Sequence, residues 1–188
     1  MYSDNTLTPR ETIRLCALGT LAGSSTTMGQ SMVYDDLAHA IRHFVSRITG
    51  PSLELMGESI ELLRFEGLAD TIGNTDTSNP TLVITQAGIK ALNTLLLANI
   101  RPGNSGLNEL VIALKFRFFH LLSVVNQTDQ INLIGEVCEI ELARLEDLHN
   151  YHKGDPGFIT DWLKHDINRL ETRLKWLHKF NSELESKS

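Results

Sequence analysis

Cysteine and long apolar segments are scarce in this sequence. Its 188 residues include only two cysteines, Cys16 and Cys138, and no CxxC motif, which excludes a disulfide framework and is typical of a reducing compartment. No apolar stretch reaches the roughly 20 residues of a membrane span, and no basic segment followed by a long apolar run stands at the start. We therefore expect a cytoplasmic protein without membrane contact, with both thiols buried in apolar helices.

Positive charge is also in short supply. Lys and Arg total 17 against 23 Asp and Glu, which gives a formal net charge of −6. Because affinity for DNA depends largely on cations that neutralise phosphates, the overall charge has the wrong sign for a nucleic-acid binder. Binding of that kind would require a local basic patch on an otherwise acidic protein.

Motifs for catalysis and for metal binding are missing. The sequence contains no GxSxG elbow, no glycine-rich phosphate loop and no HExxH motif, so we expect neither an enzyme nor a cofactor. Asp35, His39 and His43 have the four-residue spacing that places metal ligands on one helix face. No third His or Cys with a fitting position is evident, and we interpret these side chains as solvated or partly packed.

The sequence does contain a regular succession of amphipathic segments around one pair of short strands. Thr8, Pro9 and Glu11 predict a capped helix start, and residues 68–72 and 81–85 predict strands joined by a polar wing. The remaining helices are expected at 32–48, 52–66, 86–100, 107–125, 129–150 and 156–183. We predict a mostly α (α+β) fold in which residues 1–100 form a winged helix-turn-helix domain and residues 107–188 form an α-helical dimerisation domain, separated by a linker over 101–106.

The two segments around the wing carry a family resemblance. Leu63-Arg64-Phe65-Glu66-Gly67-Leu68, followed by Leu82-Val83-Ile84-Thr85-Gln86-Ala87-Gly88, resembles the PadR family of bacterial transcriptional regulators, and most closely its AphA-like subgroup. The resemblance implies a winged helix that binds operator DNA, a helical C-terminal dimerisation domain and a homodimer. In such a dimer, two copies of the helix before the wing would enter successive major grooves.

The DNA-facing surface departs from the family pattern. The family usually has a Tyr ten residues before the glycine of the Gly-Leu step, where this chain has Gly57, and basic residues where it has Glu61 and Leu62. Residues 52–70 contain one positive and five negative side chains, and carboxylates near phosphates are repulsive. We therefore look for cations on the neighbouring segments. The candidate DNA-binding residues are Arg10, Arg14, Arg42, His43, Arg47, Ser59 and Arg64.

The C-terminal segment predicts self-association. Apolar residues on its last helix recur at intervals of four and three, which defines a heptad seam that must pack against another helix, from within the chain or from a second copy. The candidate dimer interface comprises Phe116, Phe119, Trp162, Leu163, Ile167, Leu170, Leu174 and Leu177. An alternative interpretation gives the aromatic residues to an effector pocket, with Lys115, Arg117 and His120 available to hold an anionic small molecule.

Two functional hypotheses follow. The first is a dimeric transcriptional regulator that binds DNA. The second is an interaction protein with the same fold, whose acidic helix 52–66 docks a basic protein partner in place of DNA. A continuous positive strip on helix 32–48 and the N-terminal arm would favour the first hypothesis, and its absence would favour the second.

Overall fold

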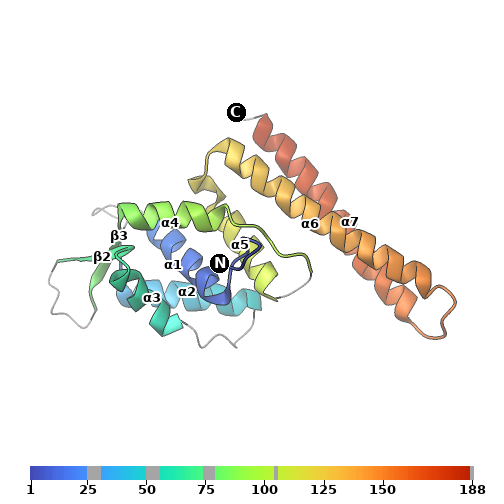
Figure 1. Ribbon diagram of the computed structural model, residues 1–188, viewed down its shortest axis with the longest axis horizontal. Coiled ribbons are helices and arrows are strands. Elements are labelled where there is room, and N and C mark those ends of the chain that lie inside the picture. Colours follow the sequence, from blue (N-terminus) through green and yellow to red (C-terminus); the bar gives the residue numbers. More distant parts are fainter. Residues whose placement is uncertain (25–30, 50–55, 74–78, 104–105, 187–188) are drawn as a thin grey trace. The chain divides into compact units, whose positions relative to one another are not determined.

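The chain forms two compact units in a computed structural model, which describes residues 1–24, 31–49, 56–73, 79–103 and 106–186. Unit 1 comprises Met1–Asn99 and Ser105–Leu122, and unit 2 comprises Ile100–Asn104 and Ser123–Ser188. Unit 1 contains five helices and a small sheet, whereas unit 2 is a hairpin of two long helices (Figure 1).

Unit 1 has the element order of a winged helix. Its sheet is antiparallel with strand order β1-β3-β2, so that β3 pairs with both neighbours, Ser31 opposite Val83 and Ala69 opposite Ile84. The helix that precedes the wing is α3, and the wing joins β2 to β3. The elements are α1 (Pro9–Gly23), β1 (Ser31–Val33), α2 (Tyr34–Thr49), α3 (Met56–Phe65), β2 (Ala69–Ile72), β3 (Thr81–Ile84), α4 (Gln86–Leu96) and α5 (Gly106–Phe118), followed by the short 3-10 turn η1 (Phe119–Leu121). The predicted fold class is confirmed.

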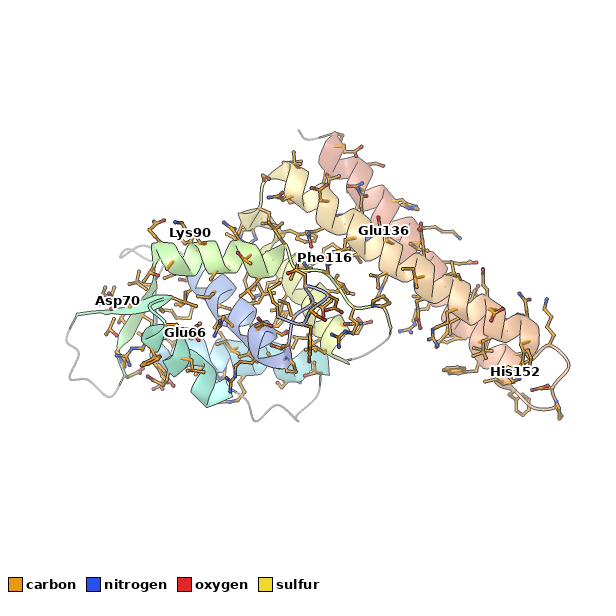
Figure 2. All side chains as sticks on the ribbon, viewed as in Figure 1. Glu66, Asp70, Lys90, Phe116, Glu136 and His152 are labelled. Atoms are coloured by element: carbon orange, nitrogen blue, oxygen red, sulfur yellow. The ribbon has the colours of Figure 1, made fainter. Side chains whose placement is uncertain are left out.

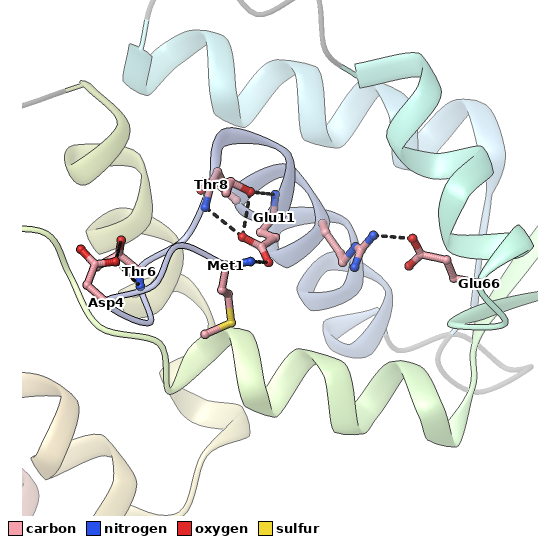
Figure 3. Close-up of polar contacts among 8 residues, drawn as sticks. Met1, Asp4, Thr6, Thr8, Glu11 and Glu66 are labelled. Atoms are coloured by element: carbon pink, nitrogen blue, oxygen red, sulfur yellow. Dashed lines mark hydrogen bonds and ion pairs between the residues drawn. The ribbon is translucent and has the colours of Figure 1, made fainter.

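Helix α1 is the centre of unit 1. It packs against α2, α3, α4 and α5, and all its residues from Thr12 to Ala22 except Arg14 are buried. Its start is the capping box expected from the sequence: the Thr8 hydroxyl accepts from the Glu11 amide, and the Thr8 amide donates to the Glu11 carboxylate at 3.0 Å (Figure 3). The reciprocal pair satisfies two backbone donors that a helix start otherwise leaves open.

Strand β1 was not expected. The sequence placed residue 32 in a helix, but Ser31–Val33 is extended and pairs with β3 before α2 begins at Tyr34. The Tyr34 amide donates to the Pro80 carbonyl at 2.9 Å, and the Asp35 amide donates to the Asn79 side chain at 3.0 Å. Backbone pairing with β3 therefore overrides the helical periodicity of this segment, and it ties the start of α2 to the end of the wing.

Helix α5 lies in unit 1, whereas the sequence grouped it with the C-terminal helices. It packs on α1 and α2 and buries Leu110, Leu114 and Phe118. The Phe118 ring lies where a Cβ on Gly19 would be, 2.4 Å from its nearest ring atom. Only glycine at this position of α1 permits such a close approach, so α5 belongs to the winged-helix core.

Unit 2 consists of α6 (Val124–Tyr151) and α7 (Ile159–Glu185), which lie antiparallel along their length (Figure 1). Leu145, Leu163 and Leu170 form a buried cluster to which Leu142 and Ile167 add. Helix α6 starts five residues before the predicted 129 because Ser123 caps it through the Asn126 amide, and α7 starts at Ile159, not at 156. No helix in the described part of the chain is long and apolar enough to span a membrane.

Candidate nucleic-acid interface

The Gly67-Leu68 motif and the Thr85–Gly88 motif of the sequence meet at the end of α3. Gly67 adopts φ +69°, a left-handed conformation that ends the helix, and its carbonyl accepts from the Thr85 hydroxyl at 2.7 Å. Thr85 also caps α4 by accepting from the Gly88 amide, and the Thr85 amide donates to the Leu68 carbonyl at 3.1 Å. A Cβ on Gly88 would lie 2.1 Å from that carbonyl oxygen. We call these contacts the clasp, which ties the turn after α3 to the start of α4.

Charged side chains on the outer face of α3 and directly after it form ion pairs. Ile60 and Leu63 are buried, while Glu61, Arg64 and Glu66 are exposed. Arg64 pairs with Glu61 at 3.2 Å, and Glu66 pairs with Arg14 of α1 at 2.7 Å (Figure 3). Two predicted DNA-binding arginines therefore already have carboxylate partners within the chain.

An aromatic side chain is exposed at the end of α3. Phe65 is 88% exposed, the highest exposure of any large apolar residue in the part of the chain that the structure describes. Asp70 of β2 is also exposed, and Figure 2 labels it together with Glu66. Burial raises the pKa of the Tyr34 phenol, and the nearby carboxylates of Glu61 and Asp35 add to that shift. The two elements next to α3 in the chain, α2 and β2, thus each carry an exposed carboxylate, Asp35 and Asp70.

Helix α2 carries two exposed arginines and two exposed histidines on one face. Arg42, His43 and Arg47 are exposed, and the His39 and His43 rings stack with centroids 6.3 Å apart. None of these four side chains forms an ion pair with a residue that the structure describes. The opposite face of α2 buries Leu37, Ile41 and Val45. The exposed side chains of His39, Arg42, His43 and Arg47 therefore face solvent, and we call them the α2 strip.

The remaining candidate DNA-binding and dimer-interface residues lie in both units. Arg10 is exposed in the first turn of α1, and the Ser59 side chain lies outside the described residues. Phe116 and Phe119 contact each other with ring centroids 4.8 Å apart, and Phe119 is buried in unit 1. The candidate seam leucines of α7, Leu163, Leu170, Leu174 and Leu177, are all buried within the single chain.

Lys115 has a position that the sequence did not reveal. It is fully buried, and its Nζ donates to the carbonyls of Leu96 and Ala98, at 2.5 and 2.7 Å. Burial lowers the pKa of this amine to about 7. Lys115 therefore satisfies carbonyls that the end of α4 leaves open and does not face an effector, as the anionic-pocket interpretation required. Its place between Leu114 and Phe116 on an apolar helix was the one available signal.

The neighbouring cation Arg117 is held by aromatic rings. Its guanidinium carbon lies 4.6 Å from the centroid of the Phe44 ring and 5.0 Å from that of Phe118. Such cation–π contacts are favourable in partly desolvated surroundings. Arg117 thereby joins α5 to α2, which leaves His120 as the exposed member of the proposed effector trio.

The described residues offer no metal centre and no thiol pair. They contain no group of three or more His, Cys, Asp or Glu side chains placed to hold a metal ion. Cys16 and Cys138 are buried and form no disulfide with each other, and burial raises the pKa of the Cys16 thiol to about 11. At neutral pH this thiol is protonated and behaves as a small apolar side chain.

Comparison with known proteins gives one family. The sequence matches the family model of AphA-like transcriptional regulators over residues 2–181. No match was found among curated proteins. Among solved structures, the chain is similar to Bacillus subtilis PadR in complex with operator DNA, at 15% sequence identity and a TM-score of 0.36, over 92% of this chain and 98% of that chain. A likeness of that strength carries no argument about function, whereas the family match spans nearly the whole chain.

Proposed function

This chain belongs to the AphA-like family of transcriptional regulators, and we propose that it acts in the cytoplasm as a homodimer that binds operator DNA through unit 1. The membership confirms the family predicted from the Gly67-Leu68 and Thr85–Gly88 steps. We propose no catalytic role and no cofactor. The observation that carries the DNA-binding proposal is the winged-helix order of unit 1, with the clasp after α3.

We assign the phosphate contacts to the α2 strip and to Arg10. DNA affinity depends on cations that replace condensed counterions, and Arg42 and Arg47 are exposed cations without a carboxylate partner among the described residues. Arg14 and Arg64, in contrast, would first have to leave Glu66 and Glu61. We therefore propose that Arg14 and Arg64 contribute less to DNA affinity than the α2 strip does.

The test removes two cations from the strip. Arg42→Ala with Arg47→Ala should weaken binding to the chain's own upstream DNA and to unrelated DNA alike, and should lower the salt slope by about two units if both contact phosphates. The matched control, Lys164→Ala with Lys175→Ala on α7, removes the same charge from unit 2 and should leave the slope unchanged. Equal binding by wild type and the α2 variant would refute the assignment.

A second candidate function is favoured by the surface of α3. An exposed Phe65 among carboxylates suits a protein partner with a basic rim around an apolar pocket. Glu61→Lys separates the two candidates, because it changes the local charge by two units and frees Arg64. If α3 approaches DNA, non-specific affinity should rise about tenfold at low salt. Unchanged DNA affinity with the fold intact would favour the protein-docking function.

A further inference from the structure

The α2 strip combines two histidines with two arginines. His39 and His43 are exposed, and their rings stack with centroids 6.3 Å apart and planes 28° from parallel. Residues three or four positions apart are neighbours on a helix surface. Arg42 therefore lies beside His39, and Arg47 lies one turn beyond His43. The four side chains form one continuous set on the solvent side of α2, in which arginine always carries a charge and histidine carries one only when protonated.

The carboxylates of α2 lie at one end of this strip. Asp35 and Asp36 are exposed and precede His39 by four and three residues. The residues three and four positions from His43 are His39, Ala40, Ser46 and Arg47. No carboxylate of α2 therefore lies one turn from His43, and a proton on this ring has only basic or uncharged neighbours on its own helix.

The elements packed against α2 place their charged groups elsewhere. Helices α1, α3 and α5 and strand β1 all contact α2. Helix α5 holds Arg117 over the Phe44 ring at 4.6 Å, and α3 brings Glu61 and Arg64 near the Tyr34 phenol at the start of α2. The ionisable residues of α1 are Arg10, Glu11, Arg14 and Cys16, and β1 has none. Within the described residues, neither histidine ring forms an ion pair with any of these groups.

A DNA phosphate would supply the negative partner that this surface lacks. Imidazole is the side chain that ordinarily changes charge between about pH 5 and 8, and its protonated form presents two N–H donors. We propose that His39 and His43 each take up a proton when unit 1 binds DNA, so that DNA affinity rises as the pH falls. The proposal rests on the proposed function, in which the α2 strip contacts phosphates.

The direction and size of the effect follow from linkage. The complex would hold more protons than the free chain and DNA apart, so a lower pH favours the complex. Each protonated imidazole at a phosphate releases about one further counterion. At pH 8 the strip would neutralise phosphates with Arg42 and Arg47 alone, and at pH 5.5 with all four side chains. The slope of log affinity against log salt should therefore be steeper by about two units at pH 5.5.

Salt titrations with unrelated duplex DNA at pH 5.5 and pH 8 test this coupling. The probe suffices because phosphate contacts do not depend on base sequence. His39→Gln with His43→Gln removes both ionisable rings but keeps polar side chains, and it should show the shallow slope of wild type at pH 8 under both conditions. His39→Lys with His43→Lys fixes both charges and should show the steep slope under both conditions. Calorimetry in two buffers of different ionisation enthalpy should detect proton uptake by wild type and its loss in the Gln variant.

A matched pair of histidines in unit 2 is the control. His165→Gln with His178→Gln changes two exposed histidines of α7 and should leave the wild-type pH response intact. Lys115, whose pKa is about 7, is present in every variant, so its contribution cancels, and circular dichroism at both pH values verifies the fold. A wild-type slope that is the same at both pH values, or a pH response that survives in the His39/His43 Gln variant, would overturn the proposal while DNA binding stands. A wild-type chain that binds no DNA at either pH would refute the proposed function itself.

Discussion

The burial of Lys115 predicts how the stability of the protein depends on pH. Its amine is fully buried, and its pKa in the folded chain is about 7, against about 10.4 for an unfolded lysine. The folded pKa is lowered, so between these values the unfolded chain binds one proton more than the folded chain. The free energy of unfolding therefore rises with pH in this window, and below it folding bears the full cost of burying the charge.

The magnitude follows from the two pKa values. Between pH 7 and 8.5, titration of this one amine should raise the free energy of unfolding by roughly 1.5 kcal/mol. The neutral amine keeps two N–H donors, so the bonds to Leu96 and Ala98 persist across the window. Lys115→Met removes the titration and leaves both carbonyls without this partner, so it should abolish the rise.

Urea unfolding at pH 7 and 8.5 measures the effect. The quantity to compare is the pH-dependent change in wild type minus that in Lys115→Met, because other groups contribute equally to both. Burial raises the pKa of the Cys16 thiol, so this group opposes the trend once pH approaches the ordinary thiol pKa of about 8.5, but it does so equally in wild type and in Lys115→Met. Lys90→Met, which alters an exposed lysine of α4, is the control and should retain the rise. An equal pH response in wild type and Lys115→Met would refute the reasoning.

Two further predictions concern backbone geometry. Gly88→Ala places a Cβ 2.1 Å from the Leu68 carbonyl oxygen and should destabilise unit 1 by several kcal/mol, whereas Gly23→Ala, which meets nothing within 4 Å, should be neutral or stabilising by up to about 1 kcal/mol; equal melting temperatures would contradict the clasp. Thr8→Ala removes the cap of α1 and should cost about 1 kcal/mol in urea unfolding, and an unchanged midpoint would show that Glu11 alone holds this helix start.

The features of the fold that the sequence predicted well are those determined by neighbouring residues. The Thr8–Glu11 capping box depends on hydrogen bonds across at most a few residues. The strands on both sides of the wing were placed within about one residue for the same reason. Local hydrogen bonds can be predicted from a sequence because they do not depend on which distant segment packs nearby.

Long-range contacts account for what was missed. Strand β1 exists because Ser31–Val33 pairs with β3 about fifty residues later, and Arg14 is paired with Glu66, which follows α3. The burial of Lys115 depends on the carbonyls of Leu96 and Ala98. The hydrophobic periodicity of a sequence does not identify hydrogen-bond partners of this kind. The DNA-binding candidates illustrate the consequence: the sequence lists cations, but only the structure separates the paired Arg14 and Arg64 from the α2 strip.

The apolar seam of α7 shows how periodicity can identify a packing face and still leave its partner open. The regular leucines of this seam pack within the hairpin, with Leu163 and Leu170 against Leu145 of α6. The exposed apolar side chains of α7 follow a less regular pattern, in which Trp162 and Trp176 flank Asp166, Arg169 and Arg173. A search for unbroken apolar repeats passes over such a stripe. Periodicity therefore identifies the face of a helix that is buried, whereas the identity of the segment that covers this face depends on the rest of the fold.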